Sequence, residues 1–129
     1  MKLLLDTHLL LWASGQSERL SASMRTILED RKNELFFSTV SIWEVAIKHG
    51  LGRNDFQVNP RLLRRGLIDN GYSELQISSE HAVTVTDLPA IHKDPFDRML
   101  VAQAIVDGIT LITTDEMIAK YPAPVRLMG

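Results

Sequence analysis

The chain has 129 residues, 45% of them hydrophobic and 23% charged, enough for one globular domain with a buried core. Its formal charge of -2 excludes an overall basic field, so any contact with nucleic acid must come from a local patch. The sequence has no cysteine, which excludes disulfides, thiolate catalysis and cysteine-ligated zinc and is typical of a reducing cytoplasm. We expect a single cytoplasmic domain over 1–129, with neither a signal peptide nor a membrane span.

The chain begins with an apolar run followed by helical patterns. Leu3–Leu5 is wholly apolar, as in a central parallel strand covered on both faces, and Asp6 ends it. A helix is expected over 8–14. Ser21 is a plausible N-cap of a second helix, because its hydroxyl can accept a hydrogen bond from a free backbone N–H.

A second strand and its helix are predicted next. Leu35–Ser38 is the strand, and apolar residues then recur at helical spacing. These residues are Val40, Trp43, Ile47 and Leu51. Glu44 lies on the same stripe, so a carboxylate is expected on a packed face, and Trp43 is expected in the core or at a dimer interface.

The middle of the chain is predicted to carry a basic amphipathic helix. Residues 52–59 are polar and indicate a loop, after which Pro60 opens the helix. One side has Leu62, Leu63, Leu67 and Ile68, and the other has Arg61, Arg64 and Arg65. An extended segment over 73–77, a short helix over 79–85 and a loop then lead to Asp94.

The next helix has the clearest start in the sequence. Asp94 can cap it, and Pro95 fits the first helical position, where its missing N–H would have no partner anyway. Asp97 then falls at the third helical position. It shares a face with Val101 and Ala104, whose small and branched side chains are typical of a packed surface.

The rest of the chain completes an alternating pattern. Gly108 is expected to end the helix, and 109–113 to form a buried strand. A short helix from Thr114 and an edge strand over 125–127 follow. Because strands alternate with helices, we predict the α/β class: a three-layer α/β/α fold around a parallel sheet of about four to five short strands.

Four carboxylates are predicted to meet at the carboxyl edge of this sheet, where open α/β folds place their sites. They are Asp6, Glu44, Asp97 and Asp115. Desolvated acids so close together repel one another unless they take up protons or share a cation. An all-oxygen site without cysteine suits Mg²⁺ or Mn²⁺, as one ion or two, and such ions activate water and stabilise the leaving oxygen of a phosphodiester.

Local alternatives exist for each acid. The two acids that end strands fit helix N-caps. Glu44 comes three residues after Ser41 and Asp97 three after Asp94, which is the spacing of a capping box. The four histidines are scattered, and His92 is the one nearest to these acids.

Four segments in chain order resemble PIN-domain ribonucleases, and most closely the VapC-type toxins of VapBC toxin–antitoxin systems. They are Leu3–His8, Ser41–Lys48, His92–Arg98 and Leu111–Asp115, of which His92–Arg98 is the most specific. The resemblance covers nearly the whole chain.

The resemblance implies a PIN fold and a Mg²⁺- or Mn²⁺-dependent endoribonuclease. Asp6, Glu44, Asp97 and Asp115 would form its catalytic metal site, with Asp6 and Asp97 the foremost ligands and Asp94 either a further ligand or a cap. It also implies RNA substrates, transfer RNA among them, a homodimer, and a VapB-like antitoxin whose C-terminal tail covers the acidic groove. Arg98 and Lys93 are candidate phosphate contacts.

Two other functions remain open. A phosphatase or phosphotransfer domain also uses an acidic edge on a parallel sheet, but its haloacid-dehalogenase-like form needs a second Asp where this chain has His8. A non-catalytic PIN module would use the acidic groove only to capture a basic tail.

Overall fold

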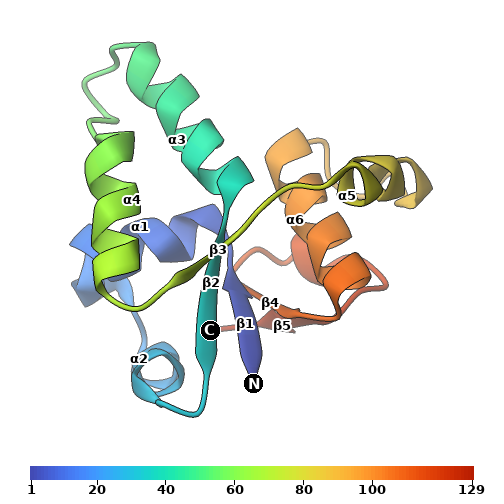
Figure 1. The fold of residues 1–129 in the computed structure, drawn as a ribbon, viewed down its shortest axis with the longest axis horizontal. Coiled ribbons are helices and arrows are strands. Elements are labelled where there is room, and N and C mark those ends of the chain that lie inside the picture. The colour runs from blue at the N-terminus through green and yellow to red at the C-terminus, as the bar shows by residue number, and fades with distance from the viewer.

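The computed structural model describes residues 1–129 and contains one parallel sheet (Figure 1). Its strands are β1 Lys2–Leu5, β2 Glu34–Ser38, β3 Ser73–Leu75, β4 Thr110–Thr113 and β5 Val125–Leu127. The order across the sheet is β3-β2-β1-β4-β5, and every neighbouring pair is parallel. The predicted parallel sheet is thus confirmed, with β5 at an edge.

Helices connect the strands. They are α1 Thr7–Gly15, α2 Ala22–Glu29, α3 Thr39–Gly50, α4 Pro60–Asp69, α5 Ser79–Thr84 and α6 Pro95–Asp107. Single 3₁₀ turns lie at Ser17–Arg19, Val85–Asp87 and Ile118–Lys120. None of the helices has the length and apolar character needed to cross a bilayer.

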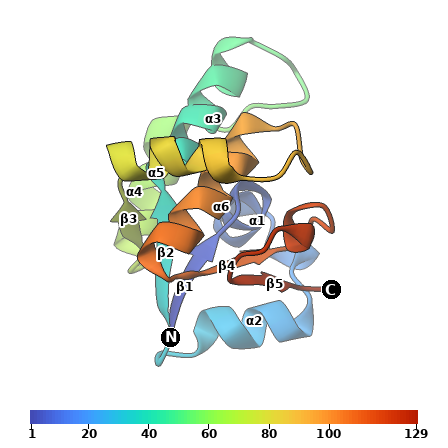
Figure 2. The same ribbon diagram turned by 90° about the vertical axis from the view of Figure 1, so that its right-hand side faces the viewer.

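Two hydrophobic cores lie on opposite faces of the sheet because side chains alternate along β1. Leu3 and Leu5 pack with α1, α2 and α4, whereas Leu4 packs with α6. Figure 2 shows α5 and α6 in front of the sheet and α1 and α4 behind it. The three-layer α/β/α prediction is therefore confirmed.

The strand order has a switch point at the carboxyl end of β1, and we call the region beside it the crevice. The chain builds β1, β2 and β3 toward one side and then crosses back to form β4 on the other side of β1. Helices that follow neighbouring strands therefore diverge here, and such a switch point is where open α/β sheets bind ligands. Asp6 follows β1 directly, and Asp115 comes two residues after β4 ends.

The apolar stripe predicted on α3 is buried only at its first residue, Val40. Trp43, Ile47 and Leu51 are 58%, 41% and 63% exposed, whereas Glu44 and Val45 are buried. Figure 1 shows the reason: α3 projects beyond the sheet, so only its first turns have a core to pack against. Trp43 is therefore not in the core, and its place at a dimer interface stays a prediction; its ring packs nearly perpendicular to that of Phe96, with centroids 5.5 Å apart.

Two smaller differences from the prediction lie in α4 and after β4. Leu62 and Ile68 of α4 are 66% and 42% exposed, because only Leu63 and Leu67 reach the core. The helix predicted from Thr114 is reduced to the 3₁₀ turn Ile118–Lys120.

Candidate metal centre at the carboxyl edge of the sheet

Asp6 is fixed in place by two hydrogen bonds. It caps α1, with Oδ1 accepting from the Leu9 N–H at 2.9 Å, so the helix cap considered as its local alternative is formed. Its Oδ2 accepts from the Thr113 hydroxyl at 2.6 Å. The residue is only 2% exposed, and this burial raises the pKa of its carboxyl, an effect that the bond from Thr113 partly offsets.

Thr113 also ties Asp6 to the next acid along the edge. Its Oγ1 accepts from the Asp115 N–H at 3.0 Å while donating to Asp6. Asp115 in turn accepts the Met117 N–H on Oδ1, at 2.8 Å, in the manner of a short cap. One hydroxyl therefore links the ends of β1 and β4.

Glu44 is buried in α3 with one oxygen unpaired. The helix is capped by Ser38, and Ser41 instead accepts a bond from the Thr7 hydroxyl, so the capping box considered for Glu44 is not formed. Glu44 Oε2 pairs with Lys48 Nζ at 2.9 Å. Its Oε1 is buried and has no hydrogen-bond partner. A buried carboxylate oxygen without a donor is costly unless a cation supplies the missing charge.

Asp94 and Asp97 open α6 in different roles. Asp94 Oδ1 accepts from the N–H groups of Phe96 and Asp97, at 2.8 and 3.2 Å, which confirms the predicted cap. Asp97 does not complete a capping box, because the Asp94 N–H donates to His92 Nδ1 at 3.2 Å. The carboxylate of Asp97 is thus left to face the crevice.

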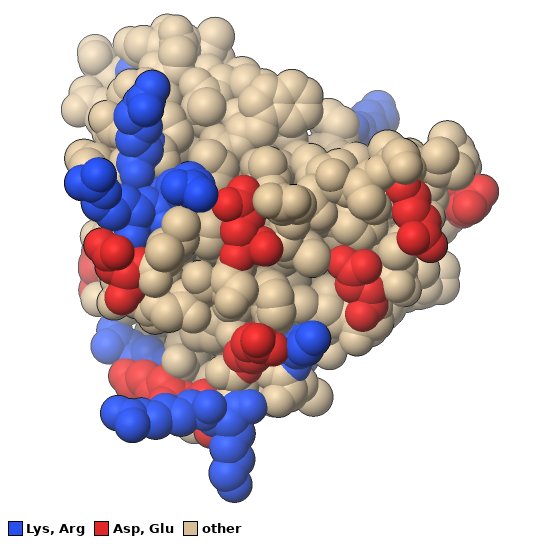
Figure 3. All heavy atoms as spheres, in the orientation of Figure 1, with Lys and Arg blue, Asp and Glu red and all other residues tan.

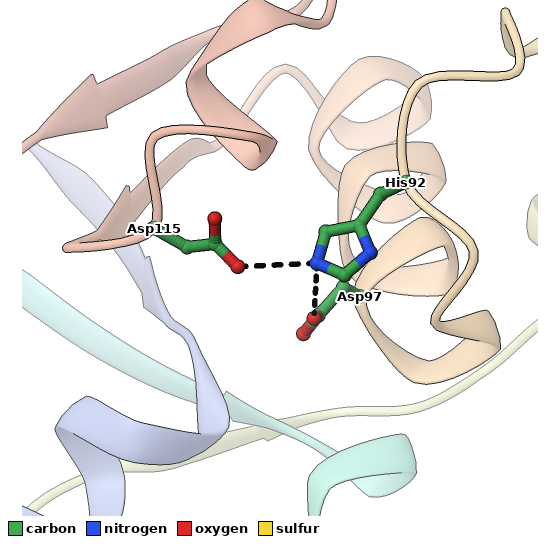
Figure 4. Close-up of side chains that lie close together, drawn as sticks. All are labelled: His92, Asp97 and Asp115. Carbon is green, nitrogen blue, oxygen red and sulfur yellow. Dashed lines mark hydrogen bonds and ion pairs between the residues drawn. The ribbon is translucent and has the colours of Figure 1, made fainter.

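His92 joins two of the predicted acids (Figure 4). Its Nε2 lies 3.2 Å from Asp97 Oδ2 and 3.1 Å from Asp115 Oδ2. One potential ligand atom from each of these three residues lies within 4.8 Å of the others. Sequence reasoning ranked His92 first among the histidines but left it out of the site; its position two residues before the cap of α6 is the signal that could have placed it there.

Electrostatic coupling extends the cluster to the remaining acids. Burial first, and then the nearby charges of Asp94, Glu44 and Asp6, raise the pKa of Asp97 to about 7, with His92 opposing them. The charge of Asp115 likewise contributes to the raised pKa of Asp6. The predicted acids are therefore close enough to influence one another's charge, although only Asp97 and Asp115 belong to the close group around His92.

The two cations predicted to contact phosphate differ. The Arg98 guanidinium donates to the carbonyls of Pro89 and Val85, at 2.9 and 3.1 Å, and to the Tyr121 hydroxyl at 3.2 Å. These bonds hold the loop before α6, so they do not support the RNA contact predicted for Arg98. Lys93 is exposed in the loop between His92 and the cap of α6.

A parallel sheet with this strand order and acids gathered at its carboxyl edge defines the class of protein. The PIN domain family model matches residues 3–124, and the chain belongs to that family. Within it, the chain is 29% identical over 127 residues to Ribonuclease VapC22 of Mycobacterium tuberculosis (strain ATCC 25618 / H37Rv), covering 96% of each chain. The resemblance to VapC-type PIN proteins is thereby confirmed.

Solved structures agree on the fold. The crystal structure of VapBC2 from Rickettsia felis bound to a DNA fragment from their promoter matches with a TM-score of 0.71 and 12% identity, over 98% of both chains. VapBC-1 from nontypeable Haemophilus influenzae matches with a TM-score of 0.59 and 15% identity, again over 98% of both chains.

Proposed function

We propose that this chain is a VapC-type endoribonuclease toxin that needs Mg²⁺ or Mn²⁺. The observation that carries the proposal is the unpaired, buried Oε1 of Glu44 in a crevice where Asp97 has a pKa of about 7. Both features indicate a site with too much negative charge for the donors around it. The family and the relative described as a ribonuclease support the same function.

The residues present fit a hard divalent cation. The acids Asp6, Glu44, Asp97 and Asp115 offer oxygen atoms, which Mg²⁺ and Mn²⁺ prefer. We assign Asp6 and Asp97 as the foremost ligands. Asp94 uses Oδ1 as a helix cap, which leaves Oδ2 as its only free contribution to the site. The number of ions and the choice between Mg²⁺ and Mn²⁺ stay predictions.

The chain's own residues would prepare the site for phosphodiester cleavage. A bound cation would supply an activated water and neutralise charge on the phosphate. Thr113 orients the carboxylate of Asp6, and the helix start at Asp94 fixes where Asp97 points. Lys48 balances part of the charge of Glu44 and is 40% exposed at its side chain, so it can also meet a phosphate oxygen.

RNA would approach over basic side chains near this edge. With Arg98 engaged by its loop, Lys93 and Lys48 are the nearest candidates. Figure 3 shows further Lys and Arg gathered on the side of the molecule where α4 lies, which agrees with its exposed Arg61, Arg64 and Arg65. These cations can hold RNA through its phosphates without reading its sequence. Transfer RNA remains our prediction for the substrate.

Regulation would follow the toxin–antitoxin pattern. The two structural neighbours are VapBC complexes, which supports a VapB-like antitoxin as the partner that silences this chain. A homodimer and a cytoplasmic location belong to the same proposal.

RNA cleavage by the purified chain tests the function. We expect cleavage of cellular RNA with Mg²⁺ or Mn²⁺, none with a chelator, and none by Asp6→Asn or Asp97→Asn. Asp69→Asn, an exposed acid on α4, is the matched control and should cleave normally. Sequencing the RNA ends would identify the target.

Cleavage that resists the chelator and both substitutions would reject the proposal. Turnover of a small phosphate ester in place of RNA would favour the phosphatase alternative. Binding of a basic peptide with no cleavage of either substrate would favour the non-catalytic module.

A further inference from the structure

The backbone of His92 is hydrogen-bonded to a buried tyrosine, Tyr121. Its backbone N–H donates to the Tyr121 hydroxyl at 2.8 Å, and that hydroxyl lies 3.4 Å from the His92 carbonyl. Tyr121 is 4% exposed and also accepts from Arg98 at 3.2 Å. The backbone position of His92 is therefore set by the core rather than by the crevice that its ring enters.

Hydrogen bonding assigns the tautomer of the ring. Nδ1 accepts from the Asp94 N–H at 3.2 Å, so Nδ1 carries no hydrogen. In the neutral ring the hydrogen then resides on Nε2, the atom that faces Asp97 and Asp115. A protonated Nε2 donates hydrogen bonds and has no lone pair to offer a metal.

Nε2 lies between two acids that come from different elements: it hydrogen-bonds to Asp115 Oδ2, and Asp97 Oδ2 lies 3.2 Å away as an ion-pair contact. Asp97 belongs to α6, and Asp115 follows β4 on a short turn where its side chain is 35% exposed. Apart from His92, the carboxylate of Asp115 receives only the Met117 N–H. Without the ring, repulsion between the two carboxylates would favour rotation of Asp115 toward water.

We propose that His92 is a positioning residue whose Nε2–H holds the carboxylate of Asp115 beside that of Asp97, without ligating the cation itself. This inference rests on the proposed function insofar as it assumes that a cation binds there. A second partner that orients a ligand's carboxylate raises the affinity of the site for metal. Oxygen-preferring ions also have little use for an imidazole when five acids surround the crevice.

Ring ¹⁵N NMR distinguishes positioning from ligation. In the metal-free protein we expect His92 to show an unprotonated Nδ1 and a protonated Nε2. On saturation with Mg²⁺, Nε2 should keep its hydrogen while its chemical shift moves. Loss of the Nε2 hydrogen on metal binding would make His92 a ligand and overturn the proposal, as would an Nδ1-protonated ring in the metal-free protein.

Mn²⁺ affinity measures the contribution of the ring. We expect His92→Ala and His92→Phe to weaken Mn²⁺ binding by about 10- to 100-fold, as the loss of outer-shell partners does elsewhere. His92→Gln places an amide N–H at the same reach from the backbone and should stay within about threefold of wild type. His49→Gln, on the exposed part of α3, is the matched control and should bind Mn²⁺ normally.

The outcomes separate this inference from the proposed function. Equal Mn²⁺ affinity in wild type and His92→Ala would overturn the positioning role, as would failure of His92→Gln to restore binding. Because the backbone bonds to Tyr121 persist in every variant, circular dichroism should report folded proteins. If wild type bound Mn²⁺ but cleaved no RNA, the proposed function would fall, and the variant affinities would still decide the role of His92.

Discussion

The two sides of the crevice are built differently. On the β1 and α3 side, Asp6 is 2% and Glu44 5% exposed, and Asp6 has both oxygens bonded. On the α6 and β4 side, Asp97 and Asp115 have side chains 18% and 35% exposed and meet through one histidine. The first side is fixed by bonds within the fold, whereas the two acids of the second side are joined to each other only through His92. Charge neutralisation is therefore the step that the fold leaves to a ligand.

Substitution on the fixed side should give the largest effect. Asp6→Asn keeps the cap on Leu9 through its one amide oxygen and turns an NH2 group toward the Thr113 hydroxyl, which can accept from it, yet it removes a charge. We expect RNA cleavage to fall by at least about 100-fold while the thermal midpoint stays equal or rises, as at sites that trade stability for function. Scanning calorimetry beside the cleavage assay checks both, and a large drop in midpoint would mean that Asp6 is mainly structural.

On the α6 and β4 side, Asp97 should make the stability of the metal-free protein depend on pH. The pKa of Asp97 is raised to about 7 from 3.8, so the folded state holds a proton that the unfolded state has already released. The proton on Asp97 therefore stabilises the folded state. This contribution is fully present below 3.8, the pKa of Asp97 in the unfolded chain, and is lost as the pH rises through about 7, its pKa in the folded chain. We expect a loss on the order of 2–3 kcal/mol between about pH 5 and pH 8.

Denaturant titrations at both pH values, with chelator present, measure this loss. Asp97→Asn should remove most of it, whereas Asp69→Asn, an exposed acid on α4, should not. Mg²⁺ should restore stability mainly at the higher pH, because a cation favours the ionised carboxylate. A free energy of unfolding that rises between the two pH values would contradict the raised pKa of Asp97.

Thr113 tests whether the two sides act together. Thr113→Val leaves Asp6 Oδ2 without its donor and the Asp115 N–H without its acceptor. We expect a loss of about 1–3 kcal/mol in unfolding free energy, with weaker Mn²⁺ binding. Thr110→Val, in the same strand, is the matched control. Equal stability in both variants would mean that the sides are independent.

The sequence predicted the parallel sheet and the cap at Asp94, because both depend on local patterns. It did not predict which oxygens stay unpaired. The capping box at Glu44 is lost because Ser41 bonds to Thr7, which is distant in sequence, and Glu44 pairs with Lys48. The box at Asp97 is lost because the ring of the nearby His92 accepts from the Asp94 N–H, a contact that depends on how the loop before α6 folds. Exposure of Trp43 depends on how far α3 extends past the sheet, which periodicity does not encode.

Lys93 should give the smallest effect. It is exposed beside the half-buried side of the crevice, so it meets a phosphate in high dielectric, where one charge contributes little. We expect Lys93→Ala to raise the KM for RNA about two- to fivefold at low salt with kcat nearly unchanged, because the contact is made equally in ground and transition states. The effect should fade as salt screens it. Lys32→Ala, before β2 at the opposite edge of the sheet, should leave KM unchanged, and an equal rise in KM for both variants would show only a loss of overall charge.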